Sequence, residues 1–116
     1  MNAGAGVRIW LAFEPVDMRL GFDGLAAKVM HVLEVNPYDG HWFVFRSRNG
    51  TRLKILTFDG VGWWLHYRRL ESGRFTWPAV DARGAIELSG AQFAVLTQGL
   101  DWRRVSVPRS IEPALA

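Results

Sequence analysis

The sequence predicts an α+β fold, a small antiparallel β-meander packed with two helices, in a single domain over residues 7–102. Three runs rich in aromatic and other apolar residues lie within 41–70, separated by turn residues, and the Asn-Gly pair between the first two runs is the strongest short hairpin signal. Outside it, apolar residues recur every three or four positions in two segments, which is the helical period. A chain of 116 residues is long enough for one modest core.

The first strand is expected at 7–13, where VRIWLAF is rich in β-branched and aromatic residues. After the break at EPVD, Asp17 fits a helix N-cap, and the turn residues NPYDG at 36–40 end that helix. Gly21 and Gly24 either lower its helix propensity or permit close backbone approach to a neighbouring element. The apolar stripe of the helix contains Met18, Phe22, Leu25, Val29 and Val32 or Leu33.

The second half of the chain is expected to contain the rest of the sheet and a final helix. Ser89 and Gln92 match a capping box of the form S-x-x-Q, which predicts a helix over 90–98. The apolar face of this helix contains Phe93, Leu96 and Leu100. The expected strands are 41–46, 52–58, 63–70 and the short GAIEL segment at 84–88. The remaining residues, 1–6 and 103–116, are expected to be flexible tails.

Composition limits the possible functions. The chain contains no cysteine, which excludes disulfides, thiolate metal sites and a cysteine nucleophile, and fits a reducing cytoplasm. We find neither an apolar run of about 20 residues nor a signal peptide, so we expect a cytoplasmic protein without membrane contact. The net charge is +3, the pI is about 10.0, and twelve of the fourteen basic residues are arginine. Arginine grips phosphate with a planar fork and stacks on rings, which favours an anionic partner.

Positive charge concentrates in residues 41–74, where six arginines and one lysine outweigh two carboxylates to give a net of +5. Strand side chains alternate between two faces, so one face of the meander is expected to carry most of these cations. Cations bind phosphate and exposed rings stack on bases, so this face predicts nucleic-acid contact. A solvated face or a protein-binding face is the open alternative. The expected face contains Arg46, Arg52, Lys54, His66 and Arg68, with Trp42 and Trp64 among them and Arg48 and Arg74 extending it.

The sequence shows no catalytic or metal-binding pattern. The histidines lack partners at the spacing of a zinc site, and the serines do not lie in a nucleophile elbow. The glycines of LGFDG match neither a Walker loop nor a dinucleotide fingerprint. We therefore expect no catalytic residues, cofactor or metal. The metal-enzyme alternative needs four carboxylates to converge, namely Asp17, Asp23, Asp59 and Glu71.

Three sequence blocks together resemble a known family: EPVDMRLGFDGL at 14–25, FVFRSRNGTRLKIL at 43–56 and DGVGWWLHYRRLESGRFTWP at 59–78. Their order and spacing, from about residue 8 to about residue 102, are similar to those of the small accessory protein (TnpB, Orf-two-like) of the insertion sequence sixty-six family of transposable elements. The resemblance implies a bacterial mobile element in which the small protein assists a large DDE-type transposase. It supplies no catalytic residue to carry over.

The residues and the resemblance together predict a non-enzymatic accessory protein for DNA transposition. Its expected partners are DNA and the transposase of the same element, and self-association is left open. In the alternative, the protein is an adaptor that docks on the transposase without touching DNA. The predicted DNA-contacting residues are Arg46, Arg48, Arg52, Lys54, Trp64, Arg68 and Arg74. The predicted partner-binding residues are Asp17, Met18, Arg19, Phe22 and Asp23.

Overall fold

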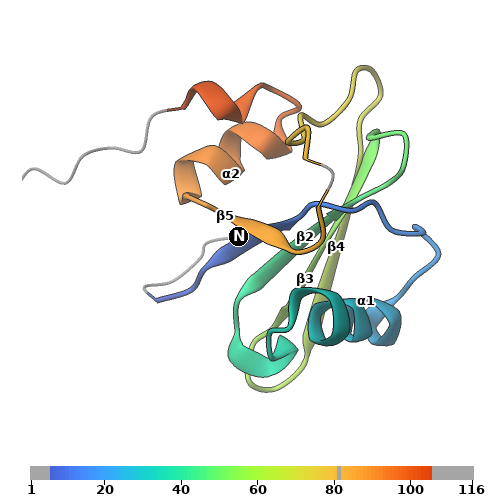
Figure 1. The fold of residues 1–116 in the computed structure, drawn as a ribbon, viewed down its shortest axis with the longest axis vertical. Coiled ribbons are helices and arrows are strands. Elements are labelled where there is room, and N and C mark those ends of the chain that lie inside the picture. Colours follow the sequence, from blue (N-terminus) through green and yellow to red (C-terminus); the bar gives the residue numbers. More distant parts are fainter. Residues whose placement is uncertain (1–5, 81, 106–116) are drawn as a thin grey trace, which may run out of the picture.

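The sheet has the strand order β4-β3-β2-β1-β5 (Figure 1) in residues 6–80 and 82–105, which are the residues that the computed structural model describes. Its strands are β1 (Ile9–Ala12), β2 (Trp42–Arg46), β3 (Arg52–Phe58), β4 (Trp63–Arg69) and β5 (Ala85–Leu88). Strands β2, β3 and β4 form the predicted antiparallel meander, and β5 pairs antiparallel with β1. Strand β1 runs parallel to β2, which requires a long crossover between them. The prediction of an α+β fold is confirmed.

Helices cover both sides of the sheet. The crossover contains α1 (Phe22–Lys28), which continues as the π-helix η1 (Val29–Leu33), and then the short 3-10 helix η2 (Pro37–Asp39). The last elements are α2 (Gly90–Thr97) and the 3-10 helix η3 (Trp102–Arg104). Figure 1 shows α1 and α2 on opposite sides of the strands.

The core has two halves, one on each side of the sheet, because side chains alternate along every strand. On the α2 side, Leu11, Val44 and Leu53 pack with Leu96 from the helix. On the α1 side, the buried residues are Ala12, Leu25, Val29, Phe43, Phe45 and Leu56. The inner strands β2 and β3 therefore contribute apolar residues to both halves, which explains their nearly continuous burial.

The capping box of α2 is confirmed. The Ser89 hydroxyl accepts a hydrogen bond from the Gln92 backbone, and the Gln92 side chain accepts one from the Ser89 backbone. Leu96 is fully buried as expected, but Leu100 is 60% exposed. Gly99 explains the difference, because its positive φ of 74° turns the chain away after the helix.

The first helix begins later than predicted. Asp17 caps a tight turn instead of the helix: its carboxylate accepts from the Arg19 N–H, and its carbonyl accepts from the Leu20 N–H. In a helix starting at Asp17, the Leu20 carbonyl would accept from Gly24 N–H, but here it accepts from the Lys54 side chain. The prediction of Asp17 as the N-cap is wrong, because a tertiary contact takes the backbone group that the helix needs.

Five of the six tryptophans belong to the core or its margin. Trp42 and Trp102 are buried, while Trp64 is 56% exposed. The segment between β4 and β5 is held over the α2 side by two indoles: Trp77 Nε1 donates to the Ala12 carbonyl, and Trp102 Nε1 donates to the Thr76 carbonyl, both at 2.7 Å. Most of the high tryptophan content is therefore structural.

The two segments expected to be tails lie mostly outside the described residues, which exclude 1–5 and 106–116. Residues 103–105 are described, and Arg103 and Arg104 belong to η3. Among the described residues, the helices are too short or too polar to cross a bilayer.

Candidate nucleic-acid interface

The arginines predicted to share one face of the meander lie on both faces. Arg46 and Arg68 both pair with Leu53, so these two arginines project on the side of the sheet that α2 covers. Arg52 and Lys54 flank Leu53 in β3 and project from the opposite side. The prediction that these cations share one face is wrong. Alternation tells which residues of one strand share a face, but turn length and register decide which residues of the next strand lie on that same face.

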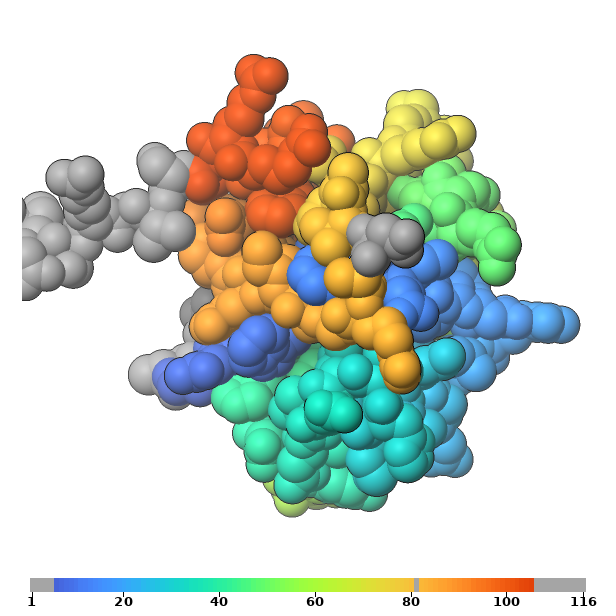
Figure 2. Space-filling model, in the orientation of Figure 1, coloured from blue at the N-terminus to red at the C-terminus, as the bar shows by residue number. Residues whose placement is uncertain are grey.

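The arginines instead gather at one end of the sheet, where β2 ends, β3 begins and β4 ends. Two backbone hydrogen bonds hold the β2–β3 turn against the segment after β4: Phe75 N–H donates to the Gly50 carbonyl at 2.8 Å, and Leu70 N–H donates to the Thr51 carbonyl at 2.9 Å. The two segments lie side by side in Figure 1 and form one corner of the molecule, green and yellow, in Figure 2. This surface, the basic end, consists of Arg46, Arg48, Arg52, Arg68, Arg69 and Arg74.

Like charges face each other at the basic end. Arg52 and Arg69 are directly opposite in the β3–β4 ladder, an arrangement that destabilises a sheet. Glu71 offsets part of this repulsion, since its carboxylate lies 3.2 Å from the Arg69 guanidinium. Six arginines and this carboxylate leave a net charge of +5, which suits the binding of an anion. Of the six, only Arg69 forms an ion pair within the described residues; Arg46, Arg48, Arg52, Arg68 and Arg74 do not.

Lys54 has a structural role instead of an exposed charge. Its side chain is buried, and Nζ donates to the Met18 and Leu20 carbonyls at 2.6 and 2.9 Å. The ammonium also lies 4.9 Å from the ring centre of Tyr67, its cross-strand neighbour, within range of a cation–π interaction. Because these contacts occupy the ammonium, Lys54 is not part of the interface proposed below.

Arg46 is half-buried and supports the hairpin turn. Its guanidinium lies 5.8 Å from the centre of the Trp77 ring and donates a hydrogen bond of 3.4 Å to the Arg48 carbonyl. Burial lowers the pKa of Arg46 from its ordinary value. The exposed charge of the basic end therefore comes mainly from the other arginines.

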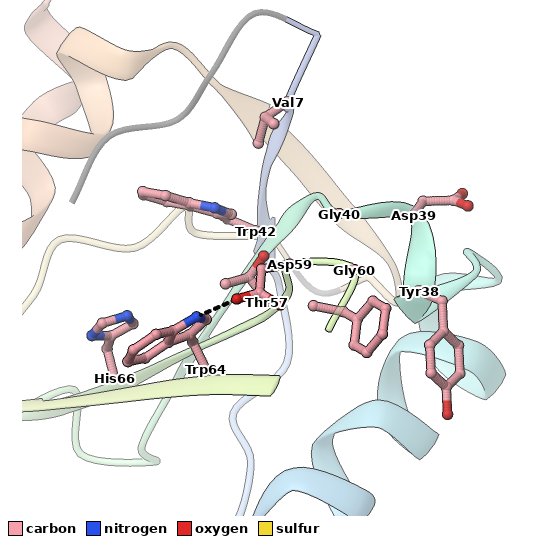
Figure 3. Close-up of a pocket in the computed structure, with 11 residues that line it drawn as sticks. Val7, Tyr38, Asp39, Gly40, Trp42, Thr57, Asp59, Gly60, Trp64 and His66 are labelled. Atoms are coloured by element: carbon pink, nitrogen blue, oxygen red, sulfur yellow. Dashed lines mark hydrogen bonds between the residues drawn. The ribbon is translucent and has the colours of Figure 1, made fainter. Parts of the chain in front are cut away.

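The opposite end of the meander contains a groove of about 770 Å³ (Figure 3). Figure 3 shows Trp42 on one side of this space and Trp64 and His66 on the other. The Trp64 and His66 rings are stacked, with centres 6.0 Å apart and planes 12° apart. This surface, the aromatic groove, is lined mainly by Trp42, Thr57, Asp59, Trp64 and His66.

Asp59 gives the aromatic groove a fixed negative charge. Its carboxylate accepts hydrogen bonds from the Gly62 and Val61 N–H groups at 2.8 and 2.9 Å, and from Trp64 Nε1 at 2.8 Å. These donors lower the pKa of Asp59, and the Gly62 hydrogen bond has the largest effect. A carboxylate beside aromatic rings suits a cation better than a phosphate. Trp64, predicted to contact DNA, therefore lies in a surface of different chemistry from the basic end.

The predicted partner-binding residues lie before and in the first turn of α1. The Asp17 carboxylate and Arg19 guanidinium are 2.7 Å apart, and this hydrogen-bonded pair lowers the pKa of Asp17 to about 2. Met18 is half-buried, and its carbonyl binds Lys54. Phe22 is 46% exposed and Asp23 is exposed beside it, so these two side chains are accessible to a partner.

Two charged residues of these surfaces are absent from the residues that the sequence assigned to DNA or to a partner. Arg69 is absent because alternation assigns it to the opposite face from Arg68, whereas both contribute to the basic end. Asp59 is absent because the DG signal predicts only a turn and gives no sign of its bond to Trp64. In residues 6–80 and 82–105, no three His, Asp or Glu side chains lie together as a metal site would require, so the four-carboxylate alternative has no site there.

Comparison with known proteins gives the family of the chain. Two proteins of Sinorhizobium fredii, both described as uncharacterized, are similar along most of their length. Protein y4hO is 48% identical over 103 residues, which cover 89% of each chain. Protein y4jC is 45% identical over 100 residues, which cover 86% of this chain and 85% of the relative. No solved structure matches this chain.

Residues 7–107 match the family described as "IS66 Orf2 like protein", which covers nearly all of the described structure. The family corresponds to the resemblance carried by the DMRLGFDGL, hairpin and WWLHYRRLE blocks. It ties the chain to insertion sequences and supports an accessory role in transposition. This protein therefore belongs to the IS66 Orf2-like family.

Proposed function

We propose that this protein is a non-enzymatic accessory factor for transposition that contacts DNA through the basic end. The contacts are phosphate contacts made by the exposed arginines Arg48, Arg52, Arg68, Arg69 and Arg74. The observation that carries the proposal is the cluster of six arginines at one corner, with two of them directly opposed in a ladder and only Arg69 in an ion pair within the described residues. Guanidinium groups bind phosphate bidentately, and DNA offers a row of phosphates to such a cluster.

The arrangement favours backbone contact over reading of bases. The arginines are spread over a turn, two strand ends and the segment after β4, and no helix is among these elements. A helix or a two-stranded ribbon is the usual means of entering the major groove. We therefore expect affinity that depends strongly on salt and weakly on sequence.

The test compares two triple variants that lose the same charge. In the first, Arg48, Arg52 and Arg74 become Gln; in the matched control, Arg8, Arg83 and Arg103 become Gln. The control arginines are exposed, do not belong to the six arginines of the basic end, and lie beside the carboxylates of Glu87, Glu14 and Asp101. Fluorescence anisotropy measures binding to labelled element-end duplex, random duplex and single strand across a salt series.

The basic-end variant should weaken binding and reduce the slope of log K against log salt by about 0.9 for each phosphate that the protein no longer neutralises. The control should keep the wild-type slope. An unchanged slope in a folded basic-end variant would contradict the proposal.

The adaptor alternative has one specific observation in its favour, the exposed Phe22 at the start of α1. An exposed aromatic ring beside a charged residue is a common anchor in protein interfaces. Absence of DNA binding at low salt, together with nuclease-resistant capture of the transposase that is abolished in Phe22→Ala, would favour this function over DNA contact.

A further inference from the structure

Within residues 6–80 and 82–105, strand β4 is a free edge of the sheet. It is the outermost strand next to β3, and all seven of its residues, WWLHYRR, pair with β3 on one side only. It contains no proline and its register with β3 has no bulge, two features that block edge pairing, and its two charged residues lie together at its end. Trp64 and Tyr67 on this strand are more than half exposed.

The backbone groups that face the free edge belong to the odd-numbered residues. The hairpin hydrogen bonds use the Gly62 carbonyl and the Leu70 N–H, which both point toward β3. Because backbone groups alternate in direction along an antiparallel strand, the even-numbered residues between them also point toward β3. The outward N–H and C=O groups therefore belong to Trp63, Leu65, Tyr67 and Arg69, and they have no backbone partner in the part of the chain that the structure describes.

The two ends of β4 carry different kinds of side chain, aromatic at one end and basic at the other. Both tryptophans lie at the start of the strand, both arginines at its end, and His66 in the middle. An antiparallel second copy, placed with His66 opposite His66, pairs all seven residues. It sets Trp64 opposite Arg68 and Trp63 opposite Arg69, and it joins outward backbone groups to outward backbone groups. Trp–Arg pairs of this kind gain from cation–π contact on both faces of the sheet.

We propose that two copies of this chain associate through antiparallel β4–β4 pairing in this register, forming one continuous sheet. The aromatic groove supplies an independent argument. It lies on the face of the sheet that carries Trp64 and His66, and Asp59 holds a negative charge against the Trp64 indole. In the proposed register, Arg68 of the second copy lies on that face, directly opposite Trp64. The groove therefore receives the cation to which its rings and carboxylate are suited, and two-fold symmetry makes the contact twice.

The two nearest shifted registers also join outward backbone groups to outward backbone groups, but they pair fewer residues of β4. One places Leu65 opposite its own copy and leaves both arginines beyond the partner tryptophans. The other places Tyr67 opposite its own copy and sets Trp63 against Glu71. Neither brings Arg68 to Trp64, so a measurement of the residue at the symmetry axis tests the proposal directly.

Cysteine crosslinking makes that measurement, because the native chain contains no cysteine. Single variants His66→Cys, Leu65→Cys and Tyr67→Cys are oxidised mildly at low protein concentration, with Ser72→Cys, outside β4, as the collision control. In the proposed register position 66 forms a non-hydrogen-bonded pair with itself, with Cα atoms about 4.5 Å apart, which suits a disulfide. His66→Cys should give the covalent dimer fastest. Faster crosslinking at position 65 or 67, or rates at all three positions equal to that of Ser72→Cys, would overturn the proposal.

Sedimentation equilibrium of the chain without cysteine supplies the second test. The wild-type protein should dimerise, and Arg68→Glu should raise the dimer dissociation constant roughly tenfold or more, since it places a carboxylate beside Asp59 and Trp64 twice. Arg48→Glu has the same change of charge outside β4 and should leave the constant unchanged. A monomer at all concentrations, or equal weakening by both variants, contradicts β4 pairing. In the dimer Arg68 and Arg69 face the second copy, so the DNA contacts fall to Arg48, Arg52 and Arg74, which lie outside β4. Because the DNA-binding variant changes only these three residues, failure of this proposal and failure of DNA contact give different results.

Discussion

The basic end and the aromatic groove lie at opposite ends of the same three strands, and they differ in charge and in how their side chains are held. At the basic end, Arg48, Arg52 and Arg74 are exposed and form no ion pair within the described residues, while the backbone beneath them is fixed by hydrogen bonds between loops. In the groove, Trp64 is fixed by a side-chain hydrogen bond to Asp59 and a stacked ring. The basic end suits an extended anion such as a DNA backbone, which can be contacted in several positions, and the aromatic groove suits a single cation beside Asp59 and Trp64.

The same comparison shows that positive charge in a sequence segment does not define one surface. Lys54 and Arg52 are two residues apart in β3 and project from the same side of the sheet. The ammonium of Lys54 is enclosed by two carbonyls and a ring, whereas Arg52 is exposed opposite another arginine. Each cation must therefore be assigned by the groups around it. Four predictions test the differences between the two surfaces, and the first of them concerns these two cations.

The largest effect is expected for Lys54→Met. The substitution keeps an unbranched side chain but leaves the Met18 and Leu20 carbonyls without their donor, at a cost of about 2 kcal/mol or more in the free energy of unfolding. Arg52→Met, on the same side of the same strand, should change stability by less than about 0.5 kcal/mol. Urea unfolding measures both. An equal decrease in the free energy of unfolding in Lys54→Met and Arg52→Met would contradict the assignment of a structural role to Lys54 alone.

A smaller effect is expected for Gly50→Ala in the turn at the basic end. Gly50 has a positive φ of 75°, which costs an alanine about 1–2 kcal/mol. The matched control is Gly62→Ala in the turn beside the groove, where φ is not in the left-handed region and an added Cβ meets nothing within 4 Å. The control should stay within about 0.5 kcal/mol of wild type. Thermal unfolding compares the two; a control as damaging as Gly50→Ala would contradict the backbone difference between the turns.

Trp64→Phe should alter fluorescence more than stability. Trp64 is 56% exposed, whereas Trp102 is 4% exposed and buried in the core. Acrylamide quenching of tryptophan emission should therefore fall in Trp64→Phe. In Trp102→Phe the quenching should persist, provided that the fold is retained. If quenching is unchanged in Trp64→Phe, the indole is covered in solution, and the crosslinking variants show whether a second copy covers it.

The smallest effect concerns two carboxylates with lowered pKa values, one near each end. Asp17 has a pKa of about 2, mainly because of the hydrogen bond from the Arg19 side chain, and Asp59 is lowered mainly by backbone N–H donors. In each case the folded pKa is depressed, so the stabilisation is present above the unfolded value of about 3.9. It is lost as the pH falls through the folded pKa. High salt should raise the pKa of Asp17 more than that of Asp59, because salt screens a surface ion pair more than bonds to neutral donors.

Carboxyl titration by NMR at low and high salt measures this difference. Asp17→Asn and Asp59→Asn assign the two titrations by removing one each. Equal salt shifts would contradict the distinction between a charged donor and neutral donors.

The elements of this fold could be derived from local signals in the chain. The Asn-Gly turn, the aromatic and apolar runs of β2, β3 and β4, and the Ser89 capping box are each signals of a few residues, and the structure contains the turn, the three strands and the cap. The concentration of arginine between residues 41 and 74 was also evident, because composition does not depend on folding.

The arrangement of those elements depended on contacts between distant residues. Strand register placed Arg46 and Arg52 on opposite faces, and the Lys54 ammonium took the carbonyls that would have extended α1 to Asp17. Pairing of β1 with both β2 and β5 left β4 at the edge of the sheet. Sequence by itself determined which side chains were present and which local turns they favoured. Only the tertiary structure decided which charges were enclosed and which remained exposed, because the carbonyls that enclose Lys54 lie more than thirty positions away along the chain.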